Sequence, residues 1–263
     1  MNTKKAILVV SFGTSYADTR KKTIEAIENR IQDAYPEYVI RRAWTSKMII
    51  RKLKDRDCYH VDTVAEAMER LAEEGFQQVF VQPTHVINGI ENEQMIRDAL
   101  TFESRFETIR FGAPLITSEE DSCQVIEALI EEMGQVPSDT ALVYMGHGTT
   151  HYANTVYAAL DYRMKDMGYS NVFLGTVEAY PSLDTMKKRL KEGGYEKVIL
   201  APFMIVAGDH ARHDMASDRE DSWKYCLEKE GYKITCVLKG LGEYPGIQNL
   251  FIKHIKDGLG EGV

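Results

Sequence analysis

The 263-residue sequence has few cysteines, no long hydrophobic run and no run of basic residues. Its four cysteines (Cys58, Cys123, Cys226 and Cys236) are scattered without a CxxC spacing, which argues against a disulfide framework or a zinc-thiolate site. No window approaches the roughly 20 apolar residues of a membrane span, and the apolar run Ala6–Val10 is too short for a signal peptide. The sequence therefore predicts a cytoplasmic protein with reduced thiols.

Charge and motifs exclude further classes of protein. Lys and Arg number 32 against 40 Asp and Glu, a net charge of −8, which argues against a nucleic-acid or anionic-membrane surface but leaves an acidic small molecule open. The sequence contains neither GxGxxG nor GxxxxGK[ST], so we expect no nucleotide dependence. It also lacks the GxSxG and HExxH motifs of common hydrolases.

Short apolar runs rich in β-branched residues alternate with amphipathic segments along the chain. The expected strands are Ala6–Phe12, Tyr38–Trp44, Gln78–Gln82, Thr108–Phe111, Ala141–Met145, Val172–Val177, Val198–Val206 and Ile234–Leu238. The expected helices are Asp18–Ala34, Asp62–Glu74, Glu91–Thr101, Glu119–Met133, Tyr152–Met167 and Leu183–Glu192. Apolar strands separated by helices are typical of an α/β protein with parallel sheets covered on both faces.

An internal repeat predicts two similar lobes. The segment Arg70–Pro83 parallels Arg189–Pro202, and Val10–Thr14 parallels Met145–Thr149, in the same order along the chain. The stretch Gly134–Ser138 has the composition of a linker. We therefore expect an N-terminal α/β lobe over residues 1–136 and a C-terminal α/β lobe over residues 137–263, with the active-site cleft between them.

Three polar residues follow expected strands of the second lobe, where ligands of open parallel sheets bind. His147 lies between two glycines after one strand, Glu178 follows the next, and His210 follows the third. Two imidazoles and a carboxylate with open positions suit a borderline divalent cation such as cobalt, nickel, iron or zinc. Each residue alone is more often an ordinary loop or capping group, and Asp209 or His213 are competing ligands.

Further candidates concern the substrate. His85 follows an expected strand of the first lobe and is either a core histidine or a contact for substrate or an auxiliary metal. Arg41, Arg42, Lys47 and Arg51 form a loose basic cluster, either a solvated helix face or a grip on substrate carboxylates. Apolar side chains near the strand ends are candidates for contact with a planar ring: Phe12, Met48, Tyr180 and Met204.

These motifs together resemble the anaerobic cobalt chelatases of the CbiK type over nearly the whole chain. The resemblance is carried by Ser11–Ser15, Trp44–Arg51, Met145–Gly148, Val177–Pro181, Ala207–Ala211 and Asp214–Asp218. It implies a nucleotide-independent class II chelatase with two α/β lobes, which inserts Co²⁺ into sirohydrochlorin, or its oxidised relative, during cobalamin synthesis. It also implies that His147, Glu178 and His210 hold the metal, that His147 accepts pyrrole protons, and that Glu178 helps neutralise the cation. Phe12, Arg51, His85 and Met204 are the residues we expect to bind the tetrapyrrole.

Other functions remain open at this point. The same fold could load iron or nickel into the same ring, because imidazole and carboxylate ligands do not separate these metals. A metal or tetrapyrrole carrier without turnover would use the same residues. A metal-dependent hydrolase would need a further carboxylate base, such as Asp209 or Asp214. The oligomeric state cannot be read from the sequence.

Overall fold

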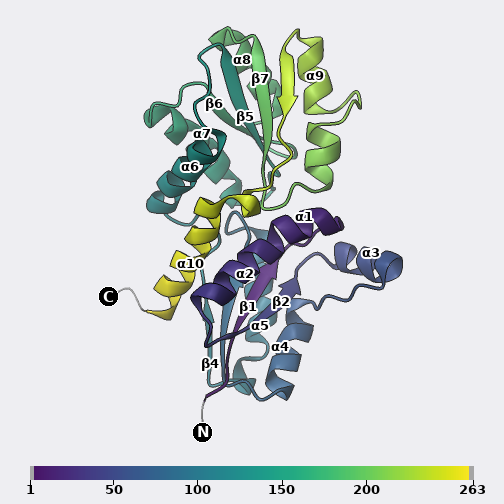
Figure 1. The fold of residues 1–263 in the computed structure, drawn as a ribbon, viewed down its shortest axis with the longest axis vertical. Helices are drawn as coiled ribbons and strands as arrows, with labels where there is room; N and C mark the ends of the chain where they lie inside the picture. Colours follow the sequence, from purple (N-terminus) through teal and green to yellow (C-terminus); the bar gives the residue numbers. More distant parts are fainter. Residues whose placement is uncertain (1–2, 261–263) are drawn as a thin grey trace. The chain divides into compact units, whose positions relative to one another are not determined.

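The structure, a computed structural model, describes residues 3–260 and contains two α/β units (Figure 1). The first unit comprises Met1–Thr117 with Pro245–Val263, and the second comprises Ser118–Tyr244. Each unit contains one four-stranded parallel sheet with helices packed against it. The expected α/β class with two similar parallel-sheet lobes is therefore confirmed.

The first sheet has the strand order β2-β1-β3-β4. Its strands are β1 (Lys5–Ser11), β2 (Val39–Trp44), β3 (Gln78–Pro83) and β4 (Thr108–Phe111). The helices of this unit are α1 (Ala17–Lys22), α2 (Ile24–Ala34), α3 (Lys47–Asp57), α4 (Val64–Glu73), α5 (Ile90–Leu100), the short η1 (Glu103–Arg105) and α10 (Pro245–Leu259). The one helix expected over residues 18–34 is thus two, interrupted at Thr23, whose hydroxyl donates a hydrogen bond to the Thr19 carbonyl.

The second sheet has the equivalent order β6-β5-β7-β8. Its strands are β5 (Thr140–Gly146), β6 (Val172–Thr176), β7 (Lys197–Phe203) and β8 (Lys233–Cys236). The helices are α6 (Glu119–Met133), α7 (Thr155–Asp166), α8 (Leu183–Gly193), α9 (Trp223–Lys229), the short turns η2 (Tyr152–Asn154) and η4 (Leu241–Glu243), and the π-helical turn η3 (His210–Met215). All seven residues of β5 are buried, whereas the edge strand β8 alternates exposed and half-buried residues. Burial of both faces of β5 explains its continuous apolar sequence.

The two units differ from the expected lobes in one respect. A boundary after residue 136 assigns α6 to the first lobe and α10 to the second, whereas the contacts place α6 in the second unit and α10 in the first. In α10, Gly258 lies against Phe80 of β3, and a ring nitrogen of His254 lies 3.2 Å from the Ala113 carbonyl oxygen. The apolar face of a helix shows that it is buried but not which sheet it covers, so the sequence did not reveal this exchange.

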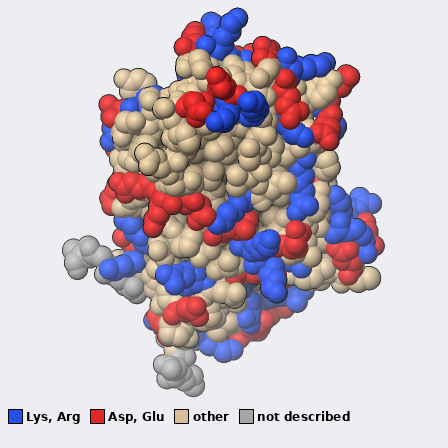
Figure 2. Space-filling model, turned by 45° about the horizontal axis from the view of Figure 1, so that its top comes forward, with Lys and Arg blue, Asp and Glu red and all other residues tan. Residues whose placement is uncertain are grey.

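Charge at the surface is mixed. Figure 2 shows Lys and Arg side chains interspersed with Asp and Glu on the face it draws, as expected for a net charge of −8 without a run of basic residues. No helix within residues 3–260 has the combination of length and hydrophobicity that crossing a membrane requires.

Candidate metal centre

The candidate centre lies at the carboxyl ends of three neighbouring strands in the second unit. His147 directly follows β5, Glu178 comes shortly after β6, and His210 begins η3 beyond β7. In the sheet β5 lies between β6 and β7, so the chain moves to one side of β5 and then to the other. Ligands of open α/β sheets bind outside the carboxyl ends of strands at such a reversal. The sheet thus brings three segments distant in sequence to one place.

Gly148 fixes the loop that carries His147. Its φ of +84° is a backbone conformation that side chains disfavour. A Cβ atom at this position would also lie 2.9 Å from the backbone nitrogen of Ala179. The two loops are joined by a hydrogen bond of 2.9 Å from the Glu178 N–H to the His147 carbonyl. A glycine here therefore lets the His147 loop lie directly against the Glu178 loop.

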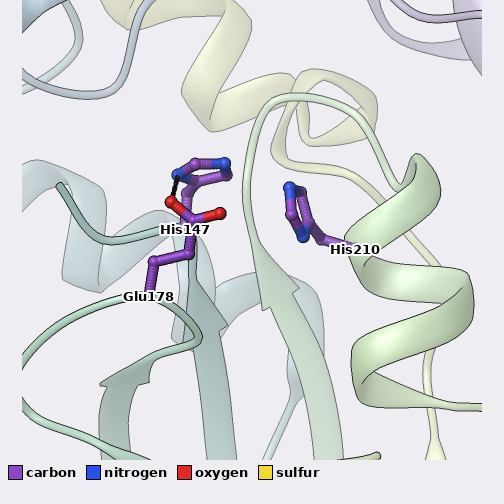
Figure 3. A group of neighbouring side chains, drawn as sticks. All are labelled: His147, Glu178 and His210. Carbon is purple, nitrogen blue, oxygen red and sulfur yellow. Dashed lines mark ion pairs between the residues drawn. The ribbon is translucent and has the colours of Figure 1, made fainter.

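The side chains of His147, Glu178 and His210 converge (Figure 3). One ligand atom from each lies within 4.8 Å of the other two, and within residues 3–260 this is the one group of three or more His, Cys, Asp or Glu that meets this criterion. Metal bonds of about 2.0–2.2 Å place neighbouring ligands of a tetrahedral site roughly 3.3–3.6 Å apart. The three ligand atoms are thus close to a coordinating arrangement and would draw together on binding an ion.

Hydrogen bonds determine which nitrogen each histidine offers. His147 Nδ1 lies 2.8 Å from the Gly148 carbonyl oxygen, and His210 Nδ1 lies 2.6 Å from Oδ2 of Asp214. Carbonyl and carboxylate oxygens only accept, so we assign the proton of each ring to Nδ1. In both histidines Nε2 then has the free lone pair that binds a metal.

The centre is accessible rather than enclosed. The side chains of His147 and Glu178 are 43% and 53% exposed, and that of His210 is 36% exposed. Two imidazoles and one carboxylate leave coordination positions free for a second ligand. The three residues include no thiolate, which would bind a borderline ion more firmly. This arrangement suits a metal that is taken up and then transferred.

The other expected site residues are placed as follows. In the first unit, Phe12 is 43% exposed directly after β1, and the Arg51 side chain on α3 is 85% exposed, 3.6 Å from Asp55. His85 also lies in the first unit; both its ring nitrogens are buried without a hydrogen-bond partner, and burial lowers the pKa of the ring to about 4. In the second unit, Met204 is half-buried directly after β7, beside the hydrophobic core of that unit.

The basic cluster around Trp44 is only partly available to bind a substrate. Arg42 forms a two-pronged ion pair with Glu28 and donates to the Tyr59 hydroxyl at 2.6 Å. Arg41 pairs with Glu74 at 2.9 Å. These two arginines are paired within their own unit. The other two members of the cluster, Lys47 and Arg51, are exposed on α3.

Sequence reasoning considered Asp214 only as a hydrolytic base and missed its contact with His210. The signal was present, because residues four apart on a helical turn are neighbours. Asp209 and His213, the competing ligands, instead lie near each other at 3.6 Å and are not in the group of three.

Comparisons with known proteins find a matching family and similar relatives. The family model described as cobalt chelatase (CbiK) matches residues 5–259. A sirohydrochlorin cobaltochelatase of Salmonella typhimurium is 42% identical over 97% of both chains. A second relative, sirohydrochlorin cobaltochelatase CbiKC of Nitratidesulfovibrio vulgaris, is 32% identical over 96% of this chain and 90% of its own.

Solved structures of low sequence identity share the fold. SirB from Bacillus subtilis with Fe³⁺ superposes with a TM-score of 0.65 at 14% identity, covering 97% of this chain and 96% of its own. CbiX, described as the terminal enzyme of sirohaem biosynthesis in denitrifying bacteria, has a TM-score of 0.56 at 17% identity, covering 96% and 98%.

Proposed function

The chain belongs to the cobalt chelatase (CbiK) family, and from this we propose that it is a sirohydrochlorin cobaltochelatase, an enzyme that inserts Co²⁺ into sirohydrochlorin. The observation that carries the proposal is the convergence of His147, Glu178 and His210 within 4.8 Å at the ends of adjacent strands. The choice of metal and ring rests on the names of the relatives, and the three side chains offer a site that could bind the metal.

The reaction exchanges one cation for two protons. Co²⁺ enters the ring, forming bonds to its nitrogens, and two pyrrole N–H bonds break with release of two protons. In the proposed site the Nε2 atoms of His147 and His210, together with the Glu178 carboxylate, hold Co²⁺ and neutralise part of its charge. As cobalt leaves for the ring, His147 Nε2 regains its lone pair and accepts one pyrrole proton, and the second proton passes to solvent water. His147 then acts first as a ligand and afterwards as a base.

We place the tetrapyrrole contacts at Phe12, Arg51, His85 and Met204. Exposed Phe12 offers an apolar face for the ring, and exposed Arg51 offers a cation for its carboxylates. Met204 supplies a flexible apolar side chain after β7. His85 is proposed from its strand-end position alone, and a polar contact would require its buried nitrogens to be uncovered.

Two further parts of the proposal concern conditions. Insertion proceeds without ATP, which is supported by the absence of phosphate-binding glycine motifs from the sequence. A cytoplasmic location is supported by the four cysteines, which are all free. Fractionation of the native host with an antibody to the protein tests the location.

The decisive experiment follows the absorbance of sirohydrochlorin mixed with purified protein and Co²⁺, without ATP. We expect the spectrum of the cobalt complex to appear far faster than without protein, and faster than with the His147→Ala variant. Parallel reactions with Fe²⁺ and Ni²⁺ measure selectivity. Protein that binds cobalt and the ring but gives no rate above background would show a carrier instead, and faster loading of iron or nickel would show that the metal is assigned wrongly.

A further inference from the structure

The π-helical turn η3 places a carboxylate behind one of the two candidate metal-binding histidines. His210 begins η3 and Asp214 lies four residues later, with Nδ1 of the histidine 2.6 Å from Oδ2 of the aspartate. Both side chains are half-buried, at 36% and 30% exposure. The wide turn of a π-helix is a recurring feature of functional sites. Here it brings the carboxylate onto the edge of the ring that does not bind the metal.

This contact restricts what the His210 ring can do. A neutral imidazole carries its proton on either nitrogen, and it binds a metal only through the other. Because a carboxylate accepts and does not donate, Asp214 favours the form with the proton on Nδ1. It also opposes rotation of the ring, which would break a short, charge-assisted hydrogen bond. His210 is thereby left with Nε2 as the atom it offers to a cation.

The two histidines are supported differently. His147 Nδ1 is held by a backbone carbonyl, that of Gly148, at 2.8 Å. Its nearby carboxylate, Glu178, is 3.6 Å away and is itself a proposed ligand. His210 has instead a carboxylate that lies outside the group of three. A carboxylate behind a metal-binding histidine fixes the orientation of the ring and makes its other nitrogen a better electron-pair donor to the metal.

We propose that Asp214 is a positioning residue for cobalt uptake, which holds His210 with Nε2 directed at the ion and does not touch the ion itself. This rests on the proposed function, because it takes His210 as a metal ligand. With Asp214 behind it, His210 binds cobalt more strongly than His147 does. Cobalt therefore stays bound to His210 while His147 is released to accept a proton.

The same turn provides a matched control. Asp209 and His213 are also an aspartate and a histidine four residues apart, but their closest atoms are 3.6 Å apart and the side chains are about half exposed. A carboxylate removed from this pair changes the local charge as much as one removed from Asp214. It leaves in place Asp214, the carboxylate that accepts from His210 Nδ1. Asp209→Asn therefore separates a general electrostatic effect from the proposed positioning.

The test measures Co²⁺ affinity by calorimetry and the visible absorption bands of bound Co²⁺ in five variants. They are Asp214→Ala, Asp214→Asn, His210→Ala, the double variant Asp214→Ala/His210→Ala, and Asp209→Asn. We expect Asp214→Ala to weaken cobalt binding by about 10- to 100-fold, the usual effect of losing such a partner, and to alter the cobalt bands. Asp214→Asn keeps an acceptor oxygen, so we expect it to retain the wild-type bands and to lose less affinity. Asp209→Asn should stay within about twofold of wild type in affinity.

The double variant decides whether Asp214 acts through His210. If it does, Asp214→Ala has little further effect once His210 is alanine. Two results would overturn the positioning role alone. One is an equal loss of cobalt affinity from Asp214→Ala in the wild-type and His210→Ala backgrounds. The other is wild-type affinity and absorption bands in Asp214→Ala while His210→Ala binds cobalt more weakly. Unchanged affinity in His210→Ala would overturn the proposed ligand set, and the role of Asp214 with it. If Asp214→Ala does not fold, Asp214→Leu takes its place, because leucine has a similar volume and no hydrogen-bond acceptor. Wild-type cobalt affinity and absorption bands in Asp214→Leu would overturn the proposal equally.

Discussion

The imidazole rings of His147 and His210 lie perpendicular to each other, with their centroids 4.5 Å apart. They follow β5 and β7, which are hydrogen-bonded neighbours in the second sheet. The sheet register therefore holds the two histidines together before any metal binds. Metal binding to such a site loses little conformational entropy, because the ligands are already close together. Single side chains of the site can also be replaced without disturbing the strands beneath.

His147→Ala should abolish cobalt insertion while leaving the fold intact. The side chain is 43% exposed and its ring contacts that of His210, so we expect the free energy of unfolding to fall by less than about 1 kcal/mol. Insertion is followed by sirohydrochlorin absorbance and unfolding by circular dichroism. His213→Ala removes a histidine of similar exposure (50%) outside the group of three; it is the control and should keep wild-type rates. Near-normal insertion by folded His147→Ala would remove the centre of the proposed mechanism.

Glu178 should matter to cobalt binding through its charge. Glu178→Ala and Glu178→Gln each remove the one carboxylate of the group, so we expect cobalt affinity to fall at least about tenfold, or ~1.4 kcal/mol. Calorimetric titration measures this. Glu192→Gln, an exposed carboxylate at the end of α8, is the control. If Glu178→Gln binds cobalt as tightly as wild type, an oxygen ligand is sufficient and charge is not what Glu178 contributes.

Much of the fold and the candidate site could be predicted from the sequence because the signals are local. Runs rich in β-branched residues, such as Val198–Val206, predict strands. Polar residues just after expected strands mark the carboxyl ends of the sheet, which is how His147, Glu178 and His210 were selected together. What was missed depends on packing at long range. The exchange of α6 and α10 between units, and the engagement of Arg42 by Glu28, depend on which surfaces meet, and a one-dimensional pattern does not contain this.

His85 should make stability depend on pH. Burial lowers the pKa of its ring to about 4, against ~6.5 in an unfolded chain. The unfolded state therefore takes up a proton first as the pH falls, so the stabilising contribution is complete above pH ~6.5 and is lost between ~6.5 and ~4. We expect wild type to lose on the order of 3 kcal/mol more than His85→Gln over this interval, at about 1.4 kcal/mol per pKa unit. Urea unfolding across this range measures the difference, and parallel curves for the two proteins would contradict a buried, neutral His85.

Arg51 should affect the tetrapyrrole and not the metal. Its side chain is 85% exposed and its ion pair with Asp55 at 3.6 Å is weak, so the guanidinium is free to meet a carboxylate. Arg51→Ala should raise KM for sirohydrochlorin several-fold and leave cobalt affinity unchanged. Lys54→Ala, another cation on the same helix, is the control. An unchanged KM would assign the carboxylates to other residues.

Gly148 connects the stability of the second unit to the geometry of the metal centre. Gly148→Ala introduces a Cβ atom at φ +84° and 2.9 Å from the Ala179 backbone nitrogen, so it combines conformational strain with a clash against a backbone that cannot rotate away. Strain of about 1–2 kcal/mol and overpacking of about 1–3 kcal/mol predict a loss of roughly 2–5 kcal/mol in the free energy of unfolding. The added Cβ would press the His147 loop away from the Glu178 loop and strain the hydrogen bond that joins their backbones.

Gly168→Ala separates these two effects. Gly168 has a similar φ of +93°, but nothing lies within 4 Å of the added Cβ, so it should lose only the strain energy, about 1–2 kcal/mol. Both variants are compared by urea unfolding and by cobalt titration at a temperature where each is folded. We expect cobalt affinity to fall in Gly148→Ala and to stay at the wild-type value in Gly168→Ala. If folded Gly148→Ala bound cobalt normally, close contact between the two loops would not be what sets the spacing of His147 and Glu178.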